Sequence, residues 1–254
     1  TQNSAPYGGG MIIENADLTI SNNTIQGNVS TEDGGGIDAD NCKSLTIQNN
    51  TISDNTAQLN GGAFSIGDCD SPTIIGNKIT DNTAGFDGGG IFYEYAFGEI
   101  SRNYIQENIA GNWGGGICLY GSGGKIVNNL IYNNNAVRGG GISYYDQSTA
   151  SVINNTIVDN SASENNSGGI GCYDGSLGTV LNTILWGNTP GELDSDAGSM
   201  LNATFSVVQD GYDGQGNIPF DPLFINDTID DFHLQSNSIC TGGGTVTSDV
   251  PTED

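Results

Sequence analysis

Three tyrosines recur once per repeat in this chain, each three residues after an isoleucine that follows a run of glycines. An aspartate directly follows two of them, and a tryptophan stands immediately before one of the glycine runs. Aromatic side chains combine an apolar face with a polar edge, which suits stacking on sugar rings. The candidate glycan-binding residues are Trp113, Tyr120, Tyr145, Tyr173, Asp146 and Asp174. Stacked tyrosines that merely cover a sheet's own backbone are the alternative, and we favour it.

Asp146 and Asp174 are the pair that could act as a catalytic acid and base. Their carboxylates should lie one repeat apart, ~5 Å, which is the spacing of such pairs in retaining glycosidases. Plain repetition produces the same spacing. We therefore assign no catalytic residue and expect a secreted, non-catalytic protein with a structural or adhesive role at the cell surface, with glycan binding or hydrolysis as the alternative.

Two motifs set the period of the chain. The string GGGI and its variants align Met11, and the string NNTI aligns Ile25, with counterparts every 25 to 28 residues. Self-similarity at this period is typical of solenoids. Alternating segments such as Leu18–Ser21 have strand character, and no 3.6-residue stripe is found. One repeat cannot bury its apolar face alone, so successive repeats must stack.

These patterns predict an all-β fold: a right-handed parallel β-helix of about nine coils, with three short strands per coil. We expect one domain over residues 1–254, with regular coils over 8–190, irregular closing coils over 191–240 and a C-terminal tail over 241–254.

Asparagines recur at two positions of each repeat. Asparagine tolerates left-handed backbone angles, and its amide can bond to the amides above and below it. We therefore expect two structural ladders rather than catalytic groups. The first comprises Asn23, Asn50, Asn77, Asn103, Asn129, Asn155 and Asn182, and the second comprises Asn28, Asn55, Asn82, Asn108, Asn134 and Asn160.

Cys42 and Cys69 each stand five residues after the residue that aligns with the isoleucine of GGGI, Ile37 or Phe64, in adjacent repeats. Their Cα atoms should be about 5 Å apart, which permits a disulfide in an oxidising compartment. The pairing of Cys118, Cys172 and Cys240 is left open.

The charge balance restricts the partners. The chain has 30 acidic and five basic residues, a formal net charge of −25. Nucleic acids and anionic membranes need clustered cations, so neither is expected as a partner, and no apolar run is long enough for membrane insertion. A neutral glycan is the ligand that suits this surface. The acidity and the Asn-x-Ser/Thr sequons favour an extracellular or cell-surface location.

Residues 8–190 resemble the right-handed parallel β-helix repeat proteins of the pectate-lyase-like superfold. The segments NTILWGNTPGEL, GNIPFDPLFIN and DFHLQSNSIC are similar to the closing region of choice-of-anchor Q surface proteins. The resemblance implies which residues an enzyme of this fold would need. Lyases of the superfold use calcium-binding aspartates with a basic residue, and its hydrolases use aspartate pairs beside basic groups. This chain has one histidine, His233, and its basic residues are scattered. A uronate lyase is therefore not expected.

Two further expectations concern ions and assembly. No cofactor is expected, although acidic clusters around Asp194 and Asp230 could hold a stabilising calcium ion. Apolar residues at the first coil, Met11 and Ile12, would leave strand edges open. Another copy could cover them, which predicts head-to-tail association.

Overall fold

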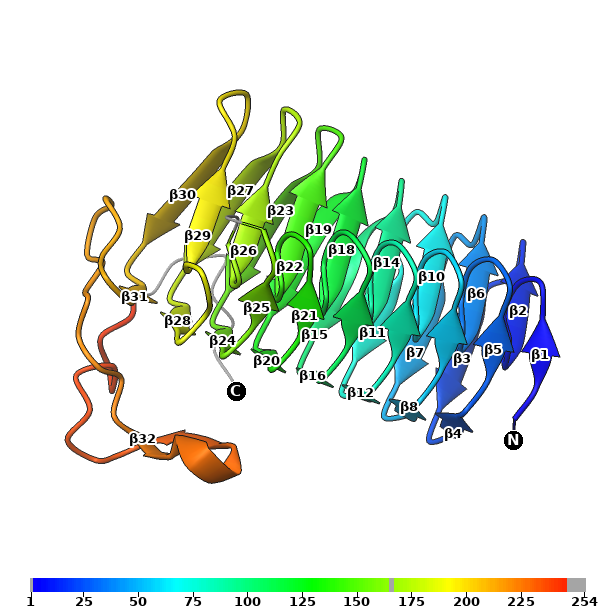
Figure 1. Ribbon diagram of the computed structural model, residues 1–254, viewed down its shortest axis with the longest axis horizontal. Helices are drawn as coiled ribbons and strands as arrows, with labels where there is room; N and C mark the ends of the chain where they lie inside the picture. The colour runs from blue at the N-terminus through cyan, green and yellow to red at the C-terminus, as the bar shows by residue number, and fades with distance from the viewer. Residues whose placement is uncertain (1, 165–166, 246–254) are drawn as a thin grey trace.

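The computed structural model describes residues 2–164 and 167–245. Figure 1 shows flattened coils stacked along the long axis of the molecule, with the N-terminus at one end. Hydrogen bonds between corresponding strands of successive coils build parallel sheets that run along this axis. The described residues complete about eight turns of the solenoid, rather than the nine we expected.

Three long parallel sheets form the sides of the solenoid. The first sheet contains β2 (Met11–Glu14), β6 (Ile37–Asp40), β10 (Phe64–Gly67), β14 (Ile91–Glu94), β18 (Ile117–Tyr120), β22 (Ile142–Tyr145), β26 (Ile170–Cys172) and β29 (Leu193–Ser195). The second contains β3 (Leu18–Ser21), β7 (Leu45–Gln48), β11 (Thr73–Ile75), β15 (Phe97–Ser101), β19 (Gly123–Val127), β23 (Thr149–Ile153), β27 (Leu177–Leu181) and β30 (Met200–Thr204). The third contains β4 (Thr24–Gln26), β8 (Thr51–Ser53), β12 (Lys78–Thr80), β16 (Tyr104–Gln106), β20 (Leu130–Tyr132), β24 (Thr156–Val158), β28 (Ile184–Trp186) and β31 (Val207–Val208).

A fourth, short sheet closes each coil between the third sheet and the glycines. It contains β1 (Ser4–Ala5), β5 (Val29–Ser30), β9 (Thr56–Ala57), β13 (Thr83–Ala84), β17 (Ile109–Ala110), β21 (Asn135–Ala136) and β25 (Ser161–Ala162). These strands have two residues each, too few for a visible alternation, so the sequence pattern did not separate them from a bend.

The core consists of apolar side chains that repeat once per coil. In the first sheet Phe64 pairs with Ile37 on one side and with Ile91 on the other, and all three side chains are fully buried. Strand alternation turns the next residue outward, so the residues three after these anchors face away from the core. The parallel register therefore places the predicted tyrosines on one outer face.

The glycine runs allow the coils to approach closely where the chain enters the first sheet. Gly88 has a φ of +66°, which L-residues rarely adopt. A Cβ on the next residue, Gly89, would lie 2.5 Å from the carbonyl oxygen of Gly115 in the following coil. Larger residues at this position would separate the coils.

The second asparagine ladder runs through the interior from Asn28 to Asn188. At each step the backbone N–H and the side-chain Nδ2 of one asparagine both donate to the Oδ1 of the next, at 2.9 to 3.1 Å. The ladder ends on Glu192, whose carboxylate accepts hydrogen bonds from the backbone N–H and the Nδ2 of Asn188. Repeated asparagine thus satisfies buried polar groups in every coil.

The first ladder has the same geometry from Asn23 to Asn155. It does not continue to Asn182, which we had expected to be its last member. The next acceptor is the Oγ1 of Thr183, at 3.4 Å from the Asn155 nitrogen. Asn182 lies one residue earlier, in a turn with a φ of 50°, and its side chain bonds to the backbone of Thr245. The cause is one extra residue in this coil: Ile157 pairs with Leu185, and not with Ile184.

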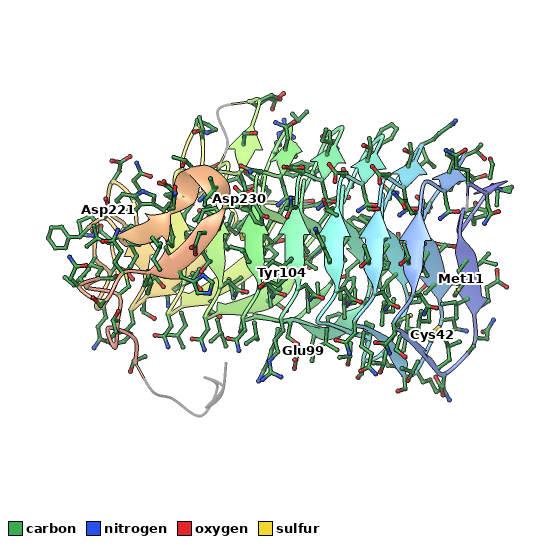
Figure 2. All side chains as sticks on the ribbon, turned by 90° about the horizontal axis from the view of Figure 1, so that it is seen from below. Met11, Cys42, Glu99, Tyr104, Asp221 and Asp230 are labelled. Atoms are coloured by element: carbon green, nitrogen blue, oxygen red, sulfur yellow. The ribbon has the colours of Figure 1, made fainter. Side chains whose placement is uncertain are left out.

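The C-terminal segment folds back along the outside of the solenoid. After the eighth turn, β32 (Phe224–Asn226), the 3-10 helix η1 (Asp227–Ile229) and β33 (Asp231–Leu234) form an antiparallel hairpin in place of a further coil. Its Phe224 and Phe232 pack on Tyr132 and Val158, which project from the third sheet. Figure 2 shows this hairpin lying across the strands of that sheet. The part of the tail over 246–254 lies outside the described residues.

Candidate functional site

The outer face of the first sheet carries a continuous row of aromatic rings. Tyr120 and Tyr145 pair in register, and their ring centroids are 4.9 Å apart. Tyr95 continues the row toward the N-terminus, with its ring 5.3 Å from that of Tyr120. We call Tyr95, Tyr120, Tyr145, Trp113 and Tyr173 the aromatic track. Tyr95, Tyr120 and Tyr145 come from successive coils, so their spacing follows from the stacking of coils, whereas Trp113 and Tyr173 meet across two coils.

Trp113 packs against the two rings of the C-terminal half of the track, Tyr145 and Tyr173. Its ring stacks on Tyr145 at 5.1 Å and meets the ring of Tyr173 edge-on at 4.9 Å. The guanidinium of Arg138, which lies in the bridge position beside Trp113, sits 4.7 Å from the same ring and also pairs with Glu164 at 2.8 Å. These rings mainly contact one another, and Tyr173 is 7% exposed.

The N-terminal half of the track is open. Tyr95 is 44% exposed, and Tyr120 is partly exposed beside it. The hydroxyl of Tyr95 lies 3.5 Å from the Asp146 carboxylate. Hydrogen bonding with Tyr95, and then the charge of Asp146, raise the pKa of Tyr120 to about 12, so the Tyr120 phenol stays neutral at physiological pH. A neutral hydroxyl beside a carboxylate can donate and accept hydrogen bonds with a sugar.

A buried aspartate fixes the middle of the track. The Tyr145 hydroxyl donates to Asp87 Oδ2 at 2.7 Å, and the Trp113 backbone N–H donates to Asp87 Oδ1 at 3.0 Å. Burial raises the pKa of Asp87, and the hydrogen bonds from Tyr145 and Trp113 oppose that rise. Neither Asp87 nor Tyr95 was among the sequence-derived candidates. Tyr95 stands one residue beyond the tyrosine column, in a turn with a φ of 49°, and only the direction of its side chain brings it to the track.

The carboxylates beside the track serve different purposes. Asp194 accepts the hydroxyl of Tyr173 at 3.2 Å, and Asp196 accepts the backbone N–H of Asp174 at 2.9 Å. Together with Trp113 and Arg138, these groups line a shallow hollow of about 470 Å³. Asp146 and Asp174 each occupy the turn that follows one of two adjacent strands, β22 and β26. The sequence assigned this pair no catalytic role, and glycan hydrolysis by it stays an untested alternative.

The family comparison agrees with this architecture. A family model described as a right-handed beta helix region matches residues 1–105 and 87–206. This chain belongs to the right-handed β-helix family. No curated protein and no solved structure matches it. The match ends before the hairpin of this β-helix, so the likeness of its closing region to choice-of-anchor Q surface proteins stays a prediction.

The cysteines of the β-helix are free thiols in the structure. Cys42 and Cys69 are buried in adjacent coils, and the Cys42 backbone N–H donates to the Cys69 Sγ at 3.3 Å. Burial raises the pKa of Cys69 to about 12, so the thiolate is disfavoured there. The predicted disulfide between the two is left to experiment.

Within residues 2–164 and 167–245, no three His, Cys, Asp or Glu side chains are grouped so that they could hold a metal ion. Over the same residues, no helix is long and apolar enough to span a membrane.

Proposed function

We propose that this β-helix is a non-catalytic adhesive protein of the cell surface or the extracellular space, and that it binds neutral glycans along the aromatic track. The observation that carries the proposal is the row of rings from successive coils, 4.9 to 5.3 Å apart, with its exposed end at Tyr95 and Tyr120. A rigid, regularly spaced set of aromatic faces needs little reorganisation to receive a ligand, which favours binding.

The charge of the protein selects the class of glycan. With a formal net charge of −25 and carboxylates such as Asp146 beside the rings, the surface repels uronates and sulfated sugars. An uncharged sugar loses nothing to this repulsion and can donate its hydroxyls to the carboxylates. Similarity of the closing segments to choice-of-anchor Q surface proteins supports the location.

The test measures binding of neutral oligosaccharides on a glycan array and then by calorimetry. Tyr120→Ala and Tyr95→Asn remove one exposed ring each, and asparagine tolerates the positive φ of position 95. Each should weaken binding roughly two- to tenfold, the worth of one aromatic contact. Phe220→Ala is the control, because Phe220 is 59% exposed and takes no part in the track.

Two outcomes would contradict the proposal. The first is the absence of binding to every neutral glycan at millimolar concentration, and the second is equal binding by the Tyr120 and Phe220 variants. Release of reducing sugar that Asp146→Asn abolishes would instead show a glycan hydrolase.

A further inference from the structure

A groove of about 760 Å³ runs between the C-terminal hairpin and the third sheet, on a different side of the solenoid from the aromatic track. The hairpin lies over this sheet, with Tyr104 beside it (Figure 2). The hairpin is held by its own apolar cluster: the ring of Phe232 packs edge-on against Tyr132 at 5.2 Å and against Phe224 at 5.2 Å. The groove is therefore preformed, since both sides of it are anchored.

The floor of the groove comes from three successive coils. Tyr104 in β16 pairs with Leu130 in β20, which pairs with Thr156 in β24. At ~4.8 Å per coil these side chains make a strip about 10 Å long, parallel to the solenoid axis. Tyr104 is 57% exposed, so its ring is available at one end.

One wall consists of turn residues that precede the first asparagine ladder. Arg102, Asn128 and Asn154 all have a φ of 55° or 56°. The asparagines that follow them are bound into the ladder, as with Asn103 and Asn129, which are linked at 2.9 and 3.0 Å. The ladder thus fixes the backbone from which a guanidinium and two amides line the groove.

The opposite wall belongs to the hairpin. Asp230, Asp231 and His233 line it, and His233 Nδ1 lies 2.6 Å from Asp231 Oδ1. This hydrogen bond lowers the pKa of Asp231 and orients the imidazole, and His233 remains open to solvent. The second ring nitrogen of His233 is left for a ligand.

We infer that this groove is a second saccharide site, for a short neutral oligosaccharide. Amide, guanidinium and carboxylate groups offer donors and acceptors across from one another, which suits ligands rich in hydroxyls. The ring of Tyr104 supplies an apolar surface for one face of a sugar. An anionic ligand would meet the carboxylates of Asp230 and Asp231, so the charges of this wall select against it.

The experiment follows amide hydrogen exchange and calorimetry with linear neutral hexasaccharides of glucose and of mannose. A saccharide in the groove should slow exchange in β16 and β33. Tyr104→Ala should weaken this binding event roughly tenfold, while Tyr104→Phe keeps the ring and should bind within about twofold of the natural protein. Arg102→Asn, which retains the left-handed turn, should also weaken it.

The two sites can be separated in the same titration. Tyr120→Ala should leave the protection of β33 unchanged, and Tyr104→Ala should leave binding at the aromatic track unchanged. The inference is overturned if no hexasaccharide slows exchange in β33 at millimolar concentration, or if Tyr104→Ala and Tyr104→Phe bind equally. Neither result bears on the aromatic track, which is tested by the variants at Tyr95 and Tyr120.

Discussion

Replacing Asn108 by alanine should destabilise the protein by about 2–6 kcal/mol, although Asn108 touches no ligand surface. The side chain is fully buried and makes four hydrogen bonds. Its Oδ1 accepts from the backbone N–H and the Nδ2 of Asn82 at 3.1 and 3.0 Å. Its Nδ2 donates to the oxygen of Ile79 and to Asn134 Oδ1, both at 3.0 Å.

The magnitude follows from which partners lose their hydrogen bonds. Asn134 Oδ1 keeps the backbone N–H of residue 108, and the Asn82 amide keeps its bonds to Ile52 and Thr80. The Asn82 N–H loses its ladder acceptor, and the Ile79 oxygen loses a donor. Each buried group left without a partner costs about 1–3 kcal/mol.

Equilibrium unfolding in urea measures the effect. Asn202→Ala is the matched control, because Asn202 is exposed on β30, and it should change the free energy of unfolding by less than about 0.5 kcal/mol. Asn108→Asp adds a pH test. A carboxylate buried there has a raised pKa, so its stability should be greatest in acid and fall as the pH rises through that value. If Asn108→Ala and Asn202→Ala unfold at the same urea concentration, the ladder does not stabilise the fold.

Three further predictions follow. Burial raises the pKa of Glu192 to about 7 from an ordinary value of 4.5. The stability gained from its proton is therefore complete below pH 4.5 and lost as the pH rises through 7, by at most about 3 kcal/mol. Glu192→Gln should flatten this profile in thermal melts, and an unchanged slope would contradict the assignment. Protein isolated under oxidising conditions should resist alkylation at Cys42 and Cys69 after denaturation, and labelling of both would exclude the disulfide. Polygalacturonate and alginate should yield no unsaturated product with or without calcium, and absorbance at the alkene band would reveal lyase activity.

The sequence predicts those parts of the fold that repeat once per coil. Ile37 and its counterparts, the ladder from Asn28 and the outward Tyr120 all recur once per repeat of 25 to 28 residues, and parallel stacking brings the recurring residues into contact. The coil that contains Leu185 has one extra residue, and the sequence could not show whether Ile184 or Leu185 is the core residue that pairs with Ile157. Both side chains suit the core equally.

Features that depend on chain reversal or side-chain direction escaped prediction. The return of the hairpin onto the third sheet rests on Phe232 meeting Tyr132, two residues far apart in the sequence with no common period. The direction of the Tyr95 ring is set by a left-handed turn. Asp87 contacts the track through the backbone of Trp113 and through Tyr145, whose side chain reaches it from two coils away.

The second asparagine ladder also gives the solenoid an electrical polarity. At each step the Oδ1 faces the preceding coil and one Nδ2–H faces the following coil, so the side-chain dipoles add along the axis, as peptide dipoles do in a helix. The other Nδ2–H donates back to a backbone carbonyl of the preceding coil, as from Asn108 to Ile79. The positive end of this array meets the carboxylate of Glu192, much as an acidic residue complements the start of a helix. A terminator of this kind is needed only once, whatever the number of coils. Whole repeats could therefore be added or removed upstream of Asn188, provided that each brings its own asparagine and Glu192 remains at the end.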